Sequence, residues 1–312
     1  MEWSLSVVGV AIGVLVGLTG MGGGALMTPI LVFFFGVDAL TAISSDLVIS
    51  LFMKPFGSIV HLVRRTVDLR LVGLLCAGSV PAAFVGALIT TWLPDDSVQS
   101  VLLVLLGCAL LLAAAGLIAR SWMQMTRARP LGEGPARMAR PATRARPLPT
   151  VLLGAAAGLI VGLTSVGAGS IVIVTLLLLY PALKASQLVG TDLVQAVPLV
   201  GSAALGHALF GSVNLGVAGS VLIGAIPGVL LGAWLSSRAP GGIIRRALAI
   251  LLMASGLKLL GLPTPVVIGA GVAALVLGNV LWIALRSRFS ASLRAERDAA
   301  GRSEAEGSTT GG

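Results

Sequence analysis

The sequence predicts an all-α polytopic membrane protein with two homologous, inverted repeats, each made of one glycine-broken, re-entrant helix and three transmembrane helices. Composition is the first observation behind this prediction. Of the 312 residues, 56% are hydrophobic and 11% are charged, and no soluble fold hides that much apolar surface. The second observation is a duplicated glycine motif, and the third is the distribution of basic residues along the chain.

The glycine motif GLTGMGGG occupies residues 17–24 inside a long apolar run, and a second copy, GLTSVGAG, occupies residues 162–169. Glycine allows positive φ angles and weakens a helix, so several glycines within eight residues predict an interruption. Inside a membrane, the freed backbone groups are tolerated only where they face protein, water or a ligand. Each copy therefore predicts a helix break in the membrane, with tight helix contacts as the alternative reason for the glycines.

Apolar segments follow the first motif at about residues 39–63, 71–92 and 98–119. Residues 120–150 then carry seven arginines, five prolines and one acid, which is too polar to span a membrane and too rich in proline for a steady helix. We therefore expect transmembrane repeat 1 at 1–120, an Arg/Pro-rich cytoplasmic linker at 121–149, transmembrane repeat 2 at 150–262, an extra C-terminal transmembrane helix at 263–285, and a disordered cytoplasmic tail at 286–312.

The second half of the chain repeats the first. An offset of 145 aligns the two glycine motifs, and an offset of 146 then holds over about seventy residues, which predicts a duplication. The pairs under this offset are Asp46 with Asp192, His61 with His207, Gly73 with Gly219, and Pro81 with Pro227.

The basic residues separate two topologies. If every apolar run crosses once, nine spans result and the basic loops divide almost evenly between the two sides, against the positive-inside rule. The arms Leu5–Val16 and Ala25–Phe35 have 12 and 11 residues, too short for a span of about 20. If both broken runs return to the side they entered, 19 of the 21 basic residues lie on one side, all except Lys54 and Lys258. We therefore predict the inverted repeat, and the nine-span parallel repeat is the alternative.

A small anion is the ligand that this arrangement favours. A helix N-terminus presents unpaired N–H groups and a partial positive charge, and one such terminus follows each glycine motif. Two of them facing each other would hold one anion. Ser165 is a further hydroxyl donor, and bonding to a local helix carbonyl is the alternative role of each hydroxyl. The candidate substrate-binding residues are Thr19, Gly22, Gly23, Gly24, Lys54, Thr164, Gly167, Gly169 and Ser170.

Lys54 lies eight residues past Asp46, well inside an apolar segment. A lysine at the centre of a membrane helix costs about 2.5–3.5 kcal/mol, so it should face a cavity or a partner. Contact with the substrate anion is one interpretation. Snorkelling to the interface and structural pairing with Asp46 are the others.

Four further residues are candidates for coupling or gating: Asp46, Asp192, His61 and His207. The two aspartates occupy matched positions, where they could carry protons or instead act as helix N-caps. The two histidines lie at the other ends of the same segments, where they could titrate near neutral pH or serve as interfacial structural residues.

The sequence contains no catalytic constellation, no metal-binding spacing and no phosphate-cradling motif, so we expect neither an enzyme nor a cofactor. Cys76 and Cys108 lie in apolar runs and are interpreted as buried small hydrophobes. The net charge of +9 reports topology rather than nucleic-acid binding, because the basic residues lie between the apolar runs.

The motifs resemble the TauE/SafE family of sulfite/sulfonate exporters, also called the TSUP family. The resemblance covers both repeats and implies a secondary transporter, with export as its direction, that moves sulfite, thiosulfate or organosulfonates across a bacterial inner membrane. Protons and membrane lipid are the other expected partners. A passive anion channel and a membrane subunit that delivers a sulfur compound to a partner enzyme are the alternatives. The second motif lacks a counterpart of Pro29, so the two sites need not be equivalent. The segments that carry the resemblance are GMGGGALMTPIL at 20–31, SSDLV and KPFGSIVHLVRRTVDLRLVG within 44–73, VGTDLVQA at 189–196, and LGHALFGSVNLGVAGSVLIGAIPGVLLGAWLSSRAP at 205–240.

Overall fold

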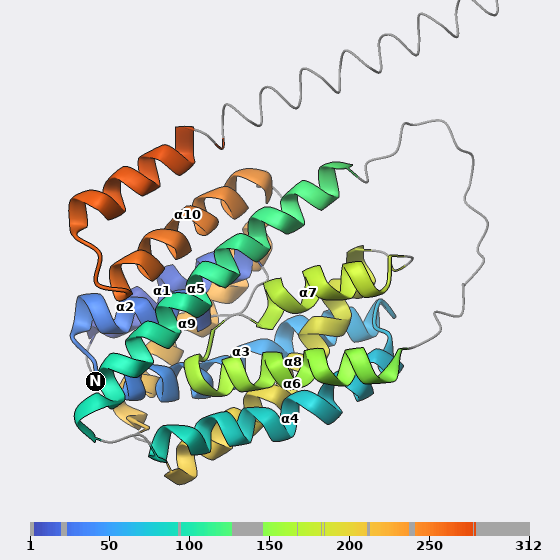
Figure 1. Ribbon diagram of the computed structural model, residues 1–312, viewed down its shortest axis with the longest axis horizontal. Coiled ribbons are helices and arrows are strands. Elements are labelled where there is room, and N and C mark those ends of the chain that lie inside the picture. The colour runs from blue at the N-terminus through green and yellow to red at the C-terminus, as the bar shows by residue number, and fades with distance from the viewer. Residues whose placement is uncertain are drawn as a thin grey trace, which may run out of the picture.

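The computed structural model describes residues 3–19, 24–92, 95–126, 146–166, 168–181, 183, 185–210, 213–236, 241–276 and 278. The regular structure of these residues is helical throughout (Figure 1). The helices are α1 (Trp3–Thr19), α2 (Gly24–Phe35), α3 (Ala39–Val63), α4 (Leu69–Trp92), α5 (Asp95–Thr126), α6 (Pro147–Thr164), α7 (Ala168–Leu179), α8 (Ala185–Phe210), α9 (Leu215–Ser236), α10 (Gly241–Leu259) and a C-terminal helix, Thr264–Val276.

Six of the described helices are long and apolar enough to cross a membrane: α3, α4, α5, α6, α8 and α9. The outer surface of the bundle carries large apolar side chains, among them Phe34 at 80% exposure and Val63 at 76%. Such a surface is stable in lipid and unfavourable in water. The chain is therefore a multi-pass membrane protein.

The two glycine motifs fall at helix breaks, as the sequence predicts, because α1 ends at Thr19 before α2 and α6 ends at Thr164 before α7. Helices α2 and α7 have 12 residues each, about 18 Å at 1.5 Å per residue, which is short of a full span. The arms before the breaks are longer than the half-helices that the sequence predicts. Helix α1 has 17 residues and α6 has 18, enough by length for α6 to cross.

Helix α5 also extends past the predicted boundary at 119, to Thr126. The segment after 119 contains no glycine or proline before Pro130, so nothing local stops the helix. Helix α6 begins at Pro147, the position at which proline is favoured. Residues 127–145 of the predicted linker lie outside the described part of the chain. Within the predicted span at 263–285, the structure describes a helix from Thr264 to Val276.

Glycines at four-residue spacing bring two helix pairs into backbone contact. Glycine removes the Cβ atom that would keep two helices apart, so this spacing allows close approach in a membrane. The paired positions advance together along both helices, so α1 runs parallel to α9 and α4 runs parallel to α6. On α9, Gly224, Gly228 and Gly232 face the carbonyl oxygens of Ser6, Val10 and Val14; on α6, Gly154, Gly158 and Gly162 face those of Leu75, Ser79 and Ala83.

Helices α3 and α8 pack against each other in the opposite sense. Their contacts run antiparallel, with the start of α3 beside the end of α8 and the reverse. The contacts that set this register are Ser44 with His207, Ser58 with Leu193, and His61 with Gly190. Matched segments of the two halves therefore face each other at the centre of the bundle.

The loops before α4 and α9 also match. The Asp68 carboxylate accepts hydrogen bonds from the backbone N–H groups of Arg70 and Leu71 at the start of α4. The Asn214 side-chain oxygen accepts from the N–H groups of Gly216 and Val217 at the start of α9. Asp68 and Asn214 are counterparts under the offset of 146, so matched residues cap matched helices.

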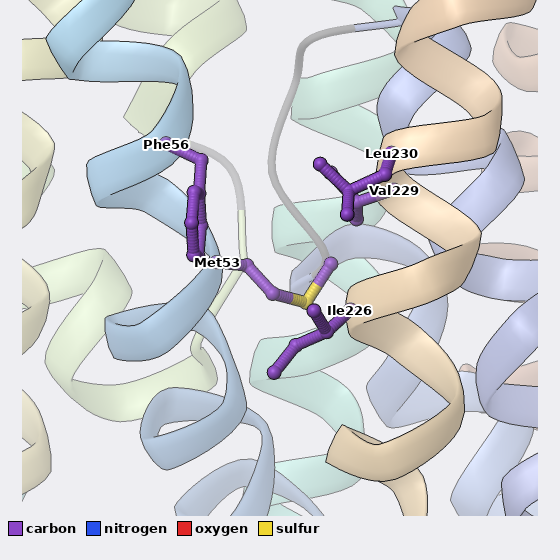
Figure 2. A pocket seen from close by; sticks show the side chains of 5 residues that line it. All are labelled: Met53, Phe56, Ile226, Val229 and Leu230. Atoms are coloured by element: carbon purple, nitrogen blue, oxygen red, sulfur yellow. The ribbon is translucent and has the colours of Figure 1, made fainter.

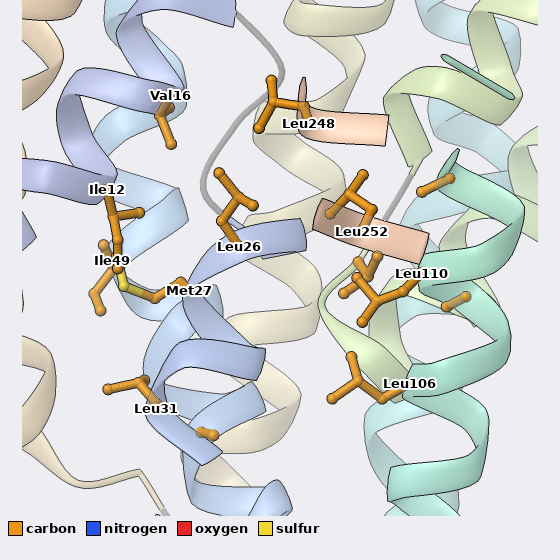
Figure 3. Packing of buried hydrophobic residues seen from close by; sticks show 14 of the residues in the cluster. Ile12, Val16, Leu26, Met27, Leu31, Ile49, Leu106, Leu110, Leu248 and Leu252 are labelled. Atoms are coloured by element: carbon orange, nitrogen blue, oxygen red, sulfur yellow. The ribbon is translucent and has the colours of Figure 1, made fainter. Parts of the chain in front are cut away.

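Apolar packing surrounds the short helix α2 (Figure 3). Met27 and Leu31 of α2 have no exposed surface. Their neighbours come from α1, α3, α5 and α10, so elements from both halves of the chain hold α2 in place. The labelled members of this cluster are Ile12, Val16, Leu26, Met27, Leu31, Ile49, Leu106, Leu110, Leu248 and Leu252.

We expect Gly78→Ala and Gly224→Ala to lower the free energy of unfolding by about 1–3 kcal/mol each, as overpacking does. The added methyl group would overlap the carbonyl oxygen of Val151 or of Ser6 on the neighbouring helix. Thermal unfolding in detergent measures the effect.

The matched controls are Gly73→Ala on α4 and Gly219→Ala on α9, where an added methyl group meets open space. These changes should be neutral or stabilising by about 0.5–1 kcal/mol through helix propensity. Equal destabilisation in both pairs of variants would contradict the role of backbone contact.

Candidate functional site between the glycine motifs

Asp46 is the centre of a polar cluster in which three segments meet. Its Oδ2 atom lies within hydrogen-bond distance of Thr28 Oγ1 of α2, at 3.1 Å, and of Ser165 Oγ, at 2.6 Å. The two hydroxyl oxygens also lie 2.9 Å apart. Asp46 and Thr28 have no exposed surface, and Ser165 is 5% exposed. The second glycine motif is thus bonded directly to residues of the first half.

Ser165 is held in an uncommon backbone conformation at the end of α6. Its φ of 56° lies in the left-handed region, which costs a non-glycine residue about 1–3 kcal/mol and persists only where the surroundings fix it. The Ser165 N–H donates to the Val161 carbonyl, and its hydroxyl bonds inside the cluster. These contacts fix the point at which the chain turns from α6 towards α7.

Neither aspartate acts as a cap of its own helix. Asp38 caps α3 by accepting from the N–H of Thr41, and Asp46 is the eighth residue of that helix. Asp192 is likewise the eighth residue of α8, which begins at Ala185. The N-cap interpretation of the two aspartates is therefore wrong, because both helices begin earlier than that interpretation requires.

Lys54 lies between the two aspartates along the central helix pair. Its ammonium group interacts electrostatically with the carboxylates of both Asp192 and Asp46. The side chain is half-buried. One cation therefore faces one carboxylate from each half of the chain, as expected of a lysine inside a membrane protein, which needs a partner.

Asp192 lies beside the start of α7. A Cβ atom added at Gly169 would come within 3.0 Å of the Asp192 Oδ2 atom. The carboxylate is thus within reach of a helix N-terminus, where negative charge is stabilised. In both halves, an aspartate of the long helix lies against the short helix that follows the glycine motif.

Several buried polar atoms of α3 and α8 have no hydrogen-bond partner among the described residues. They include Ser45 Oγ, Asp46 Oδ1, Ser50 Oγ and Gln195 Nε2. Ser50 lies near the Asp46 carboxyl group without forming a hydrogen bond of good geometry to it. Buried polar atoms without partners are costly and concentrate at functional sites.

His207 is a buried structural link between the two halves. Its Nε2 lies 2.8 Å from the Gly162 carbonyl oxygen and therefore donates to it, and its Nδ1 lies 3.0 Å from Ser44 Oγ. The side chain has no exposed surface. Helices α6 and α3 thus enclose His207 at the end of α8.

His61 differs from its counterpart. It is partly exposed, and its Nδ1 lies 2.8 Å from Thr66 Oγ1 in the loop after α3. The structural interpretation therefore fits His61, with bonds made inside its own loop.

The remaining candidate residues for substrate binding lie in or next to the two glycine motifs, and the structure describes only some of them. Thr164 Oγ1 donates to the Ile160 carbonyl at 2.6 Å, so it forms the local bond that the sequence left as an alternative. Gly24 and Gly169 lie at the starts of α2 and α7. Gly22, Gly23 and Gly167 lie outside the described residues, as do the side chains of Thr19 and Ser170.

A recess of about 210 Å³, including the open space at its mouth, lies between α3 and α9 (Figure 2). One of its lining residues, Met53, precedes Lys54 in the sequence. Its walls are formed by Met53 and Phe56 of α3 and by side chains of α9, and all of them are apolar. The described side chains that line the recess therefore offer an anion no donor. The lining residues from α9 are Ile226, Val229 and Leu230.

Sequence reasoning missed Thr28, Ser44 and Gln195. Thr28 is the only hydroxyl residue of α2, and that isolation in an apolar helix was the available signal. Ser44 and Gln195 gave none, because their partners, His207 and Ser79, are 163 and 116 residues away.

Comparison with known proteins agrees with a membrane transporter. A family model described as "Sulfite exporter TauE/SafE" matches residues 5–259. The chain is 37% identical over 262 residues to "Probable membrane transporter protein YjnA" of Bacillus subtilis (strain 168), covering 83% of this chain and 100% of that protein. It is 24% identical over 250 residues to "Probable membrane transporter protein YdhB" of the same organism, covering 80% and 96%. No solved structure matches the chain.

We expect His207→Leu to lower the free energy of unfolding by about 1–3 kcal/mol, because it leaves the buried Gly162 carbonyl without its donor. Thermal unfolding in detergent is the measurement. His61→Leu is the matched control and should cost less than about 1 kcal/mol, since a partly exposed group can exchange its bond for water. A larger effect at His61 than at His207 would contradict this assignment.

Proposed function

The chain belongs to the TauE/SafE family of sulfite exporters, and on this premise we propose that it is a secondary transporter of small sulfur-containing anions. It moves sulfite, thiosulfate or organosulfonates across the bacterial inner membrane by alternating access around a site between the two glycine motifs. Membership of a transporter family excludes an enzyme.

The observation that carries this proposal is the position of Lys54 between Asp46 and Asp192. Of the 21 basic residues, Lys54 alone lies in the interior of a long apolar helix of the central pair. A cation kept inside a membrane protein is a functional candidate, because its insertion is costly. One carboxylate lies on each side of Lys54, and a bound anion would replace one of these contacts.

The antiparallel packing of α3 against α8 supports a site at the middle of the membrane. In each of the three contact pairs between α3 and α8, the two residue numbers add up to 251. With the offset of 146 between matched residues, the point at which α3 faces its own counterpart falls between Phe52 and Met53. Lys54 is next to this point, and inverted-repeat transporters bind their substrates there.

The helix breaks supply the other half of the proposed site. Thr28 in the second turn of α2 bonds to Asp46, and Gly169 near the start of α7 lies beside Asp192, so we place both helix N-termini at the proposed site. N–H groups at these termini would share the anion with Lys54, as half-helix ends do in transporters with inverted repeats. Rocking of one half against the other would then expose this region to each side in turn.

The alternatives differ in flux. A passive anion channel would give flux that does not saturate, and an accessory subunit would give none from the purified protein alone. Saturable flux in liposomes separates the proposed transporter from both.

We expect Lys54→Ala to reduce saturable flux of sulfite, thiosulfate or taurine into liposomes by about tenfold or more, since a charged hydrogen bond contributes about 1.5–3 kcal/mol. The matched control is Lys258→Ala, which removes the same charge from an exposed residue bonded to Thr264. Flux should persist in this control. Unchanged flux in Lys54→Ala would return Lys54 to a structural role.

The inverted topology is tested at two matched loop positions, Val67 and Val213, which precede α4 and α9. In a background in which Cys76 and Cys108 are replaced, we expect Val213→Cys to react with an impermeant thiol reagent added outside cells and Val67→Cys to remain unreactive. An inverted repeat presents matched loops to opposite sides. Labelling of both positions from the same side would support the nine-span parallel repeat instead.

A further inference from the structure

We propose that Asp46 is a proton-binding site that couples proton binding to anion binding at Lys54, with the proton closing the contact between the second glycine motif and the first half of the chain. This inference rests on the proposed function and adds the coupling ion to it.

The contact is a closed triangle of oxygen atoms. Asp46 Oδ2, Thr28 Oγ1 and Ser165 Oγ lie 2.6 to 3.1 Å from one another along all three edges. Each distance is within the range of an O–H···O hydrogen bond. The three residues come from α3, α2 and the end of α6, so the triangle joins the two halves at a helix break.

The number of hydrogen atoms that the three groups can supply indicates whether Asp46 is protonated in this triangle. Each hydroxyl group supplies one hydrogen atom, and an ionised carboxylate supplies none. Two hydrogen atoms can form only two of the three bonds. A proton on Asp46 Oδ2 supplies the third, so that each oxygen donates once and accepts once around the triangle. The geometry therefore fits a neutral Asp46.

Burial of the other carboxyl oxygen points the same way. Asp46 Oδ1 is buried and has no hydrogen-bond partner among the described residues. An ionised carboxylate would leave part of its charge on this atom, and buried unpaired charge is far more costly than an unpaired neutral carbonyl.

Few other ionisable groups face Asp46 from the surrounding helices. Lys54 on its own helix interacts with it. On α8, Asp192 faces Lys54 and His207 faces Ser44. Helices α2, α6, α7 and α9 contain no ionisable side chain. The charge of the site is therefore set mainly by Lys54 and the two aspartates.

Counting these charges gives the direction of coupling. When Asp46 and Asp192 are both ionised, Lys54 is outnumbered by two carboxylates and an incoming anion is repelled. When Asp46 is protonated, one carboxylate remains and the lysine charge becomes available to the anion. Proton and anion then bind together, and each raises the affinity for the other by the same factor.

The test compares wild-type protein, Asp46→Asn and the matched control Asp38→Asn in liposomes. Labelled thiosulfate is the probe, with labelled sulfite in a parallel series. For the wild type, we expect acid outside to raise initial uptake about fivefold or more, the lower end of measured coupling between sites. Asn keeps a donor towards the hydroxyls but cannot release a proton. Asp46→Asn should therefore lose the stimulation, which is measured relative to the exchange of labelled for unlabelled anion that the same variant shows at equal pH.

Asp38→Asn removes a carboxylate at the α3 N-cap, away from the triangle, and should retain the stimulation. Stimulation that survives in Asp46→Asn, or wild-type uptake that is insensitive to the pH gradient, would overturn the coupling. Absence of saturable flux in the wild type would instead overturn the proposed function.

A second measurement does not depend on transport. The infrared absorption of a protonated carboxyl group should be present in the wild type and in an Asp192→Asn variant, and absent in Asp46→Asn. Its absence from the wild type near neutral pH would overturn the protonation of Asp46 even if the variant fails to fold.

Discussion

Backbone contact at glycine is the constraint on which the rest of the structure depends. Helices α1 and α6 each pack against a helix of the other half, and glycines at every fourth position allow this approach. Because α1 and α6 lead directly into the glycine motifs, their docking fixes where the breaks lie. The same residue type therefore serves two purposes, close helix packing along α6 and α9 and interruption at the motifs. Both of the interpretations that the sequence offered for glycine apply, at different positions.

The centre of the bundle is a compromise between stability and function. Helices α3 and α8 carry two aspartates, a lysine and a histidine into a region that apolar residues would stabilise more cheaply. His207 and Ser44 offset the cost of their burial by forming hydrogen bonds across the two halves. Asp46 Oδ1, Ser45 Oγ and Ser50 Oγ form no hydrogen bond among the described residues. A protein that retains such atoms at its centre has a use for them there, because local inconsistencies of this kind concentrate at functional sites.

The two halves have the same order of helices but differ in the contacts of their matched polar residues. Asp46 bonds to Thr28 and Ser165, whereas the counterparts of those residues under the offset of 145 are Ile173 and Gly20. His207 is enclosed and His61 is partly exposed. The polar cluster around Asp46 therefore has no equivalent around Asp192 in the residues that match it by offset, and the proposed site is asymmetric.

The sequence by itself determined the apolar helices, the two breaks and the offset of 146, because these follow from local glycine content, apolar runs and repeated residues. It did not determine the ends of α5 and α6, which extend past the apolar segments for lack of a breaker. Only the tertiary structure decided that Thr28 and Ser165, 137 residues apart, meet on Asp46, and that His207 is buried. Such contacts depend on how helices dock, and docking is set by side chains distant in sequence, which no local pattern records.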